Sequence, residues 1–474
     1  MDTVNHSPSG ATFLKANRKL TSWFAVFVIS TGVIVACSLI RLASSQFGTT
    51  FELVALGALV GGYGVCIFAM HGGRRTTVLG LFNMANALFV GFPGFVLLGS
   101  PVLEVPPEYL ADAMYGSVLS LAAINVIGWR LLPRSRTPNV SDSNLSVQRT
   151  AIVLAGAALY FGASLAKASG LIPPISYLGE GFAFVGILGI AVGLVSAPRY
   201  RLVSFATIAI VLLFLAYMFY NHSGTGRLRI VALACSLLLL ISLRFPLYRF
   251  KTWAIIGSPV AIWALASIRL AYQESLATGS SAGRSGLESM LSPIATLAHL
   301  LAAIDSGWES AGGASYLTIF AAPLPNSVHP DWLPPALGYD LVRLVAPDRF
   351  GSGFSLAVTS FGEAVWNFGV VGFVIVVPLA VLLIAFLDWV LVRCSGYVDG
   401  GSVYYPVAMV AALMMAGTIG DFAWNGVHTF GTRIGTRVPA VAVLLLIVAF
   451  FAVLLRSLPA PPQRDQVGRI STYG

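Results

Sequence analysis

The sequence predicts an all-α, polytopic transmembrane protein of about twelve membrane-spanning helices. Of its 474 residues, 57% are hydrophobic and only 10% are charged, and the mean hydropathy is +0.83. A soluble domain carries about 25% charged residues, so this chain has too few charges to cover a water-facing surface. Apolar stretches of about 20 residues recur along it, each long enough to cross a hydrocarbon core of ~30 Å. These stretches are continuous rather than alternating, which favours helices over the strands of a β-barrel.

The apolar runs place the spanning helices in order along the chain. We expect them at 22–43, 51–70, 77–98, 111–132, 150–168, 180–197, 202–220, 229–245, 253–272, 357–388, 403–420 and 438–456. The first run is too long for the core of a signal peptide, so we expect it to remain as the first helix.

Three further stretches complete the predicted organisation. Residues 1–21 and 457–474 are polar tails, residues 22–272 hold helices one to nine, and residues 357–456 hold helices ten to twelve. Between the two helical parts, residues 273–356 are rich in Gly, Pro and Ser. This composition predicts one large loop, which begins with an amphipathic helix at 286–304.

Lysine and arginine residues define the predicted orientation. They are frequent in both tails and in every second connection, so the positive-inside rule places both termini in the cytoplasm and the large loop outside. This topology also explains the net charge of +9 without a nucleic-acid partner. The four cysteines lie in or beside apolar runs and lack metal-ligand spacing, so we expect neither a metal centre nor a disulfide framework.

Several arginines fall on the outer side, where short loops usually lack them. Arg227 and Arg229 end a glycine-rich turn after the seventh helix and open a helix whose N-terminus favours an anion. Arg433 and Arg437 are four residues apart, so on a helix they would share one face and could share a pyrophosphate. A guanidinium binds phosphate well because its planar fork stays charged. A solvated turn, and neutralisation by Asp421, are the alternative interpretations.

The large loop adds further candidates. Arg284 precedes its amphipathic helix, and Tyr316, His329 and Trp332 belong to a run rich in proline and aromatic residues. Such a run cannot form a spanning helix, which predicts an ordered re-entrant or interfacial segment. Its aromatic rings can stack on sugars or lie at lipid headgroups.

A carboxylate lies near the start of the tenth predicted helix. Glu363 is placed at or just inside the membrane boundary, where burying a carboxylate is costly. Asn367 follows four residues later, so both side chains project from one helical face. The pair either takes part in chemistry or locks two helices together through hydrogen bonds.

The stretch around Glu363 resembles the Wzy-type polymerases of bacterial surface polysaccharides. The resemblance rests on a serine, a Gly-Glu pair, an Asn-Phe-Gly triplet and a further glycine that opens a helix, here Ser360, Gly362, Glu363, Asn367, Phe368, Gly369 and Gly372. Upstream, the family's glycine, Ser-Tyr-Leu and spaced prolines look like Gly313, Ser315, Tyr316, Leu317, Pro323, Pro325, Pro330 and Pro334. The Gly-Arg turn at Arg227 and the late, large outer loop are also similar to the family. Many members have a basic residue and a tryptophan where Asn326 and His329 stand here.

This resemblance implies a metal-independent, inverting glycosyltransferase of the GT-C type, without a cofactor, in the bacterial inner membrane. The growing glycan on undecaprenyl diphosphate would be the donor, and the non-reducing end of a new lipid-linked repeat unit would be the acceptor. The implied partners are this lipid-linked oligosaccharide and the bilayer. The sequence leaves open whether a flippase and a chain-length regulator also take part.

Two chemical demands assign roles to the residues under this resemblance. A departing diphosphate needs stabilisation, and the attacking hydroxyl needs help to lose its proton. Glu363 and His329 are the candidate bases, although Glu363 could equally orient an arginine. Arg227 and Arg284 are expected to stabilise the reacting diphosphate. The expected contacts to diphosphate and sugar come from Arg229, Arg433, Arg437, Tyr316, Trp332 and Asn367.

Two other functions remain open at this level. An O-antigen ligase would use the same donor with a different acceptor, and a late outer loop suits it too. A secondary transporter or flippase would carry internal repeats with broken helices in matching positions, and no such repeat is visible in the sequence.

Overall fold

The computed structural model of the chain is all-helical over the part that it describes. It describes residues 9–96, 105, 107–131, 146–169, 176–195, 200–217, 228–244, 247–276, 288–321, 337–347, 350–351, 355–397 and 404–457. Within these ranges, seven helical segments are long and apolar enough to cross a membrane, and four shorter apolar helices accompany them. An all-α architecture compatible with a polytopic membrane protein is therefore confirmed, while the count of twelve spans stays a prediction.

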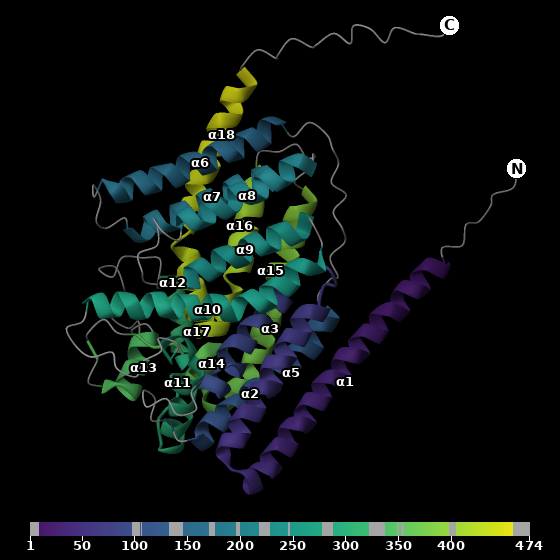
Figure 1. Ribbon diagram of the computed structural model, residues 1–474, viewed down its shortest axis with the longest axis vertical. Helices are drawn as coiled ribbons and strands as arrows, with labels where there is room; N and C mark the ends of the chain where they lie inside the picture. The colour runs from purple at the N-terminus through teal and green to yellow at the C-terminus, as the bar shows by residue number, and fades with distance from the viewer. Residues whose placement is uncertain are drawn as a thin grey trace, which may run out of the picture.

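The first helices form a bundle at the lower right of Figure 1. Helices α1, α2 and α5 pack on one another, and α2 also packs along α3 and the π-helix η1. Their bounds are α1 Ser9–Phe47, α2 Thr49–Met70, α3 Val78–Asn86, η1 Ala87–Gly91, α4 Pro93–Val96 and α5 Pro107–Leu131.

A second group of helices lies above this bundle in Figure 1. Helix α6 packs on α7 and α18, and α9 packs on α16. The contact between α6 and α7 is very close, because a Cβ built on Gly156 would lie 2.6 Å from the carbonyl oxygen of Gly186. The bounds are α6 Ser146–Ala168, α7 Ser176–Val195, α8 Tyr200–Ala216, α9 Leu228–Arg244, α16 Tyr404–Gly417 and α18 Val438–Ser457.

The remaining helices connect the two groups. Helix α17 packs on α3, α9, α12 and α14, and α15 packs on both α5 and α16. The bounds are α10 Tyr248–Leu276, α11 Glu288–Asp305, α12 Ala314–Ala321, α13 Leu337–Val345, α14 Thr359–Phe368, the 3₁₀-helix η6 Gly369–Val371, α15 Gly372–Tyr397 and α17 Ile419–Gly435.

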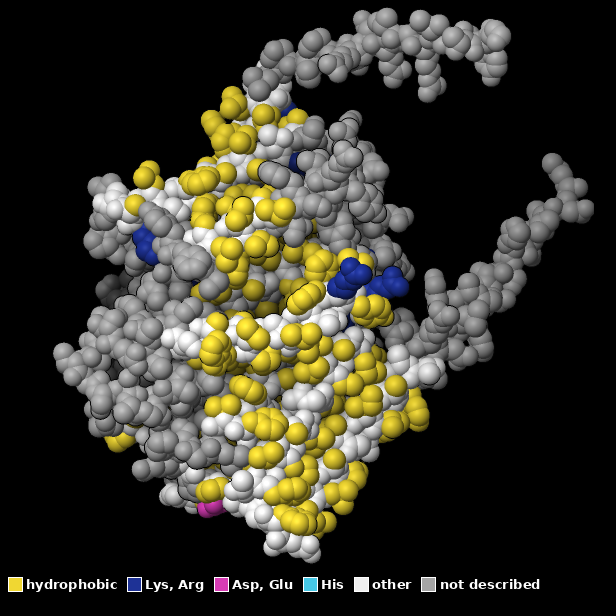
Figure 2. Space-filling view, in the orientation of Figure 1, with side chains coloured by type: hydrophobic (Ala, Val, Ile, Leu, Met, Phe, Trp, Pro, Cys, Tyr) yellow, Lys and Arg dark blue, Asp and Glu magenta, His cyan; other side chains and the backbone are white. Residues whose placement is uncertain are grey.

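The surface agrees with a lipid environment. Figure 2 shows hydrophobic side chains over most of the described face, with Lys and Arg confined to small patches. On α1, for example, Phe24, Leu39 and Leu42 are more than half exposed. Large apolar side chains exposed on a helix of this length are stable against hydrocarbon rather than water.

Neutral polar side chains join four helices inside the first bundle. Asn83 and Asn125 exchange two amide hydrogen bonds of 2.7 and 2.8 Å. Asn125 also donates to the Tyr63 hydroxyl at 3.0 Å, and this hydroxyl lies 2.7 Å from that of Ser30. We call these four residues the amide network. All four are buried, so the network fixes the packing of α1, α2, α3 and α5 without placing a charge in the membrane.

Two predicted regions differ from the observed helices. The span expected at 357–388 is broken after α14, where Gly369 has a φ of 62° that a residue with a Cβ rarely adopts. The stretch 421–437, expected as a short outer connection, is largely helical and forms most of α17. This stretch contains many glycines and polar residues, so it lacks the continuous apolar run by which the other helices were predicted. A half-buried helix needs apolar residues on only one part of its surface.

Candidate functional site

Helix α17 is interrupted in its middle. Asn425 has φ −152° and ψ 26°, and Gly426 has φ 74° and ψ −161°, so the helical hydrogen bonds stop there. Arg433 pairs with Asp421, twelve residues earlier, although a straight helix would separate their Cα atoms by ~18 Å. The chain therefore turns back sharply at the break and forms two half-helices joined by an apex.

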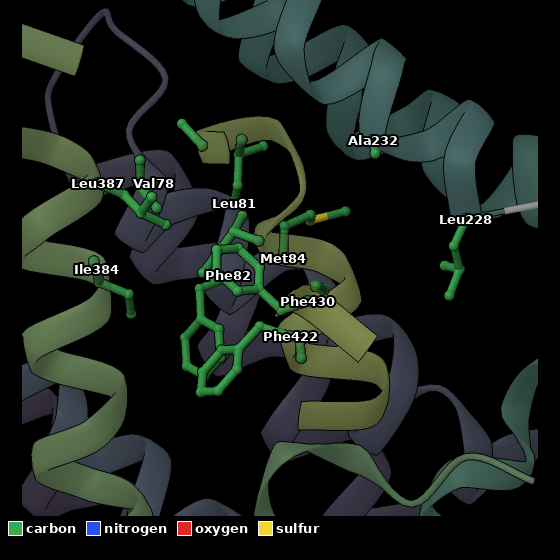
Figure 3. Close-up of a cluster of buried hydrophobic side chains, with 14 of the residues drawn as sticks. Val78, Leu81, Phe82, Met84, Leu228, Ala232, Ile384, Leu387, Phe422 and Phe430 are labelled. Atoms are coloured by element: carbon green, nitrogen blue, oxygen red, sulfur yellow. The ribbon is translucent and has the colours of Figure 1, made fainter. Parts of the chain in front are cut away.

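A contact between two aromatic residues of α17 also shows that the chain turns back. The rings of Phe422 and Phe430 lie 6.4 Å apart in an edge-to-face arrangement, on opposite sides of the break. Phe422 also stacks on Phe82 of α3, with centroids 5.6 Å apart. Figure 3 shows these rings together in the apolar cluster beneath the turn. Packing against α3 thus holds the first half-helix while the second one folds back over it.

Glu363 of α14 binds the apex. Its carboxylate accepts hydrogen bonds from the backbone N–H groups of Val427 and His428, the latter at 3.1 Å, and from the Ser315 hydroxyl at 3.2 Å. The two N–H groups begin the second half-helix and would otherwise lack intrahelical partners. The carboxylate, which is fully buried, therefore caps this half-helix and interacts favourably with its dipole.

Asn367 and Asn425 complete the attachment of the apex. The Asn367 amide donates to the Ser315 hydroxyl at 2.6 Å, and its oxygen accepts from the Ser315 N–H at 3.2 Å. Asn425 accepts from the Val358 N–H at 2.9 Å, directly before α14. Together with Glu363, these contacts tie α12, α14 and α17 into one buried polar unit, which we call the apex clamp (Ser315, Glu363, Asn367 and Asn425).

His428 extends from the apex clamp towards the partly exposed side of α17. Its Nδ1 lies 2.5 Å from the Thr318 hydroxyl oxygen, and that hydroxyl donates to the Ser315 carbonyl at 2.6 Å. Because the Thr318 hydroxyl has one proton, His428 must donate from Nδ1. The neutral imidazole then has its lone pair on Nε2, as a general base requires.

Three arginines gather at the other end of α17. Arg433 pairs with Asp421, and Arg229 of α9 pairs with Glu180 of α7. Arg437, which is buried, donates to the Thr418 hydroxyl at 2.9 Å and lies 4.0 Å from the centroid of the Phe184 ring. All three guanidinium groups interact electrostatically with the Asp421 carboxylate. We call Arg229, Arg433 and Arg437 the arginine cluster.

The arginine cluster carries more positive than negative charge. Counted over the part of the chain that the structure describes, its three guanidinium groups face two carboxylates, those of Asp421 and Glu180, which is an excess of one positive charge. Among the described residues, the buried Oδ2 atom of Asp421 has no hydrogen-bond partner. The site can therefore accept an anion and, beside it, one donor such as a sugar hydroxyl.

Aromatic rings lie next to the apex clamp. The rings of Trp308 and Trp366 are 5.5 Å apart, and those of Tyr316 and Phe368 are 6.0 Å apart. Trp308 is 40% exposed, whereas Trp366 is buried. Half-exposed aromatic faces beside polar groups are suited to stacking on sugar rings.

The structure places only part of the predicted site. It brings Arg229, Arg433 and Arg437 together at one end of α17, and Tyr316, Glu363 and Asn367 near its apex. The other predicted site residues lie outside the described part of the chain: Arg227, Arg284, His329 and Trp332.

Some functional candidates were not expected from the sequence. Glu180 pairs with Arg229 although the two are far apart in the chain, and its only sequence signal is a carboxylate at the start of an apolar run. Thr318 lies in the proline-rich loop, and no pattern there indicates its contact with His428. The neutralisation of an arginine by Asp421 was one of the two open interpretations, and the structure contains that pair.

Comparison with protein-family models, with curated proteins and with solved structures finds no match to this chain.

Proposed function

We propose that this protein is a polymerase of lipid-linked oligosaccharide repeat units, for O-antigen or exopolysaccharide, in the bacterial inner membrane. The hydroxyl at the non-reducing end of a new repeat unit attacks C1 of the growing glycan. The bond from C1 to the diphosphate oxygen breaks with inversion, undecaprenyl diphosphate leaves, and the hydroxyl proton passes to a base. Both termini face the cytoplasm and the reaction takes place on the outer face.

The arginine cluster is the observation that carries this proposal. Arg229 comes from α9, Arg433 from the end of α17 and Arg437 from the turn between α17 and α18, and the three lie together in a largely buried site. Arginines in such a place are costly unless a function uses them. A diphosphate matches them, because planar guanidinium groups bind its oxygens in pairs and their charges stabilise it as it leaves.

Two carboxylates, those of Asp421 and Glu180, pair with arginines of the cluster. Asp421 and Glu180 lower the cost of burying guanidinium groups and fix their positions before the lipid arrives. The incoming diphosphate then adds negative charge to a site with an excess positive charge. Charged groups that are already in place when the diphosphate begins to leave are the condition for strong electrostatic stabilisation of a transition state.

Glu363 acts as a positioning residue in this proposal. Its two carboxylate oxygens receive three protein hydrogen bonds, and the side chain is fully buried. By capping the second half-helix of α17, it sets the direction of the segment that carries His428 and Arg433. His428, with its lone pair on Nε2, is then the described residue best suited to take the proton of the attacking hydroxyl.

Transport is the second candidate, because the structure contains broken helices. The breaks at Gly369 and at Gly426 resemble the interrupted helices that line substrate sites in secondary transporters. A transporter for a polyprenyl-diphosphate sugar would use the same arginines without a base. The two functions therefore differ in their need for His428.

A chain-length assay tests the proposal. A deletion strain would be complemented with wild type, Arg433→Gln, His428→Gln and, as control, Asn83→Ala, with membrane levels of each variant measured. The proposal expects a full polymer ladder from wild type and the control, and only single repeat units from Arg433→Gln and His428→Gln. Long lipid-linked chains that fail to reach their final acceptor would identify a ligase. A ladder unaffected by His428→Gln but lost in Arg433→Gln would favour transport.

A further inference from the structure

A groove on the described surface lies away from the residues of the arginine cluster and the apex clamp. It has a volume of about 1070 Å³ and runs between α5, α11 and α15. Its α5 wall includes Glu108, Asp112, Leu119 and Ala123, which recur at helical spacing along one face. From Glu108 to Ala123 this wall rises ~22 Å, which exceeds the ~15 Å of hydrocarbon in one leaflet of a bilayer.

The two ends of the groove differ in chemistry. One end holds three exposed carboxylates, those of Glu108, Asp112 and Asp305. The other end is lined by Leu119, Val374 and other apolar side chains. A groove with a charged end and a hydrocarbon end matches an amphiphile, in which a polar head is joined to an apolar tail.

The charge at the acidic end of the groove, which we call the rim, determines which polar headgroup can bind there. Arg41 lies 3.2 Å from Asp112, but it also pairs with the buried Glu52 at 3.0 Å. Tyr109 donates to Asp305 at 2.7 Å, which orders this carboxylate without neutralising it. Taken over the described residues, the rim thus keeps an excess of negative charge, which repels a diphosphate and attracts a group with ammonium donors.

The apolar wall of the groove indicates that the hydrocarbon tail of the ligand enters from the bilayer. Leu119 is 48% exposed and Val374 is 69% exposed, and both belong to segments apolar and long enough to span the membrane. At that depth the surrounding medium is hydrocarbon, so the groove opens sideways into the bilayer. A lipid chain can enter there, whereas a soluble peptide cannot.

From this geometry we infer that the groove between α5, α11 and α15 binds a phospholipid whose headgroup is a primary amine, as in phosphatidylethanolamine. The ammonium group binds Glu108 and Asp305 at the rim, and one acyl chain lies along Leu119, Ala123 and Val374. The inference is separate from the proposed glycan synthesis, because the groove's acidic rim excludes the diphosphate lipid.

Native mass spectrometry of the full-length protein tests the inference. Protein released from detergent would be mixed with phosphatidylethanolamine, phosphatidylcholine or phosphatidylglycerol carrying identical chains. We expect phosphatidylethanolamine to be retained about tenfold better than the other two, because only it combines a positive charge with N–H donors. Equal retention of phosphatidylcholine, or preferential retention of phosphatidylglycerol or of a polyprenyl diphosphate, would overturn the inference.

Three variants separate recognition of the head from recognition of the tail. Glu108→Gln combined with Asp305→Asn should abolish the preference while leaving the protein folded, since both side chains are exposed. Val374→Trp should fill the groove and reduce retention of all three lipids alike. Glu309→Gln, an exposed carboxylate just beyond α11, is the matched control and should change nothing. A preference that survives the double variant contradicts the assignment to this rim.

Discussion

The amide network and the arginine cluster are both buried and polar, but they are built on different principles. In the amide network, Asn83, Asn125, Tyr63 and Ser30 join four helices with neutral groups that satisfy one another. In the arginine cluster, ionic groups are brought together with an excess positive charge, and one oxygen of Asp421 has no hydrogen bond from any residue that the structure describes. The first arrangement needs nothing further, whereas the second can take up a ligand.

The break in α17 explains how the charged region is assembled. It lets Arg433 return to Asp421, and the apex clamp fixes its direction through Glu363. The four residues of the amide network lie within helices rather than at such a break, and the network depends on the packing of α1, α2, α3 and α5. Variants in the two regions should therefore differ in kind: those around α17 should alter activity, and those in the network should alter stability alone.

The largest effect is expected from Gly426→Ala. Gly426 has a φ of 74°, and a Cβ there would overlap the Glu363 carboxylate, so both the backbone and the clamp would be strained. We expect a loss of about 3 kcal/mol or more in the free energy of unfolding, seen as a lower thermal midpoint in detergent. Gly420→Ala is the control, since a Cβ at Gly420 meets nothing within 4 Å. Equal midpoints for the two variants would contradict the break as the origin of the site.

Arg433→Gln should have the next largest effect. It leaves the Asp421 carboxylate, which is 1% exposed, without its close cation. Because Arg229 and Arg437 still act on this carboxylate, we expect a loss below the about 3–5 kcal/mol that removal of one partner of a buried pair costs. Adding Asp421→Asn should restore most of the thermal stability but not the length of the polymer. If the double variant also regains the full ladder, the cluster is a structural ion pair and not a diphosphate site.

Glu363→Gln should have an intermediate effect on stability and a large one on activity. The amide can still accept from one backbone N–H, but the charge that faces the half-helix is lost, at a cost of about 1–3 kcal/mol. We expect shortened chains at nearly normal membrane levels, measured on the same gel as wild type. Full activity in Glu363→Gln would remove the positioning role, and Glu309→Gln serves as the matched exposed control.

The smallest effect is expected in the amide network. Asn83→Ala removes one side of the reciprocal pair with Asn125, and such interhelical hydrogen bonds average about 0.6 kcal/mol, with a maximum of about 1.7 kcal/mol. The thermal midpoint should fall slightly and the polymer ladder should stay unchanged. A shortened ladder from a normally expressed Asn83→Ala would show that the network also takes part in function.

The sequence predicted the helices better than it predicted the site. Continuous apolar runs place most helices within a few residues, because lipid imposes one length and one polarity on every span. The half-helices of α17 were not predicted, because the stretch around Asn425 and Gly426 is short, glycine-rich and partly polar. The signal that remained was the unusual arginines at 433 and 437.

The parts of the site that could not be predicted from the sequence depend on contacts between residues far apart in the chain. Glu180 and Arg229 lie on α7 and α9, and Glu363 reaches the backbone of α17 more than sixty residues later. No spacing rule connects such positions, because tertiary packing alone brings them together. The predicted pairing of Glu363 with Asn367 captured one helical face of the apex clamp, but not the backbone groups that Glu363 caps.

Binding of undecaprenyl diphosphate to the purified protein tests the central claim most directly. The dissociation constant would be measured in detergent for wild type, Arg229→Gln, Arg437→Gln and the Asn83→Ala control. The account predicts binding at least about tenfold weaker for each arginine variant, because each removes a charge-assisted contact, and no change for the control. Unchanged affinity in both folded arginine variants would contradict the claim that the arginine cluster binds the diphosphate.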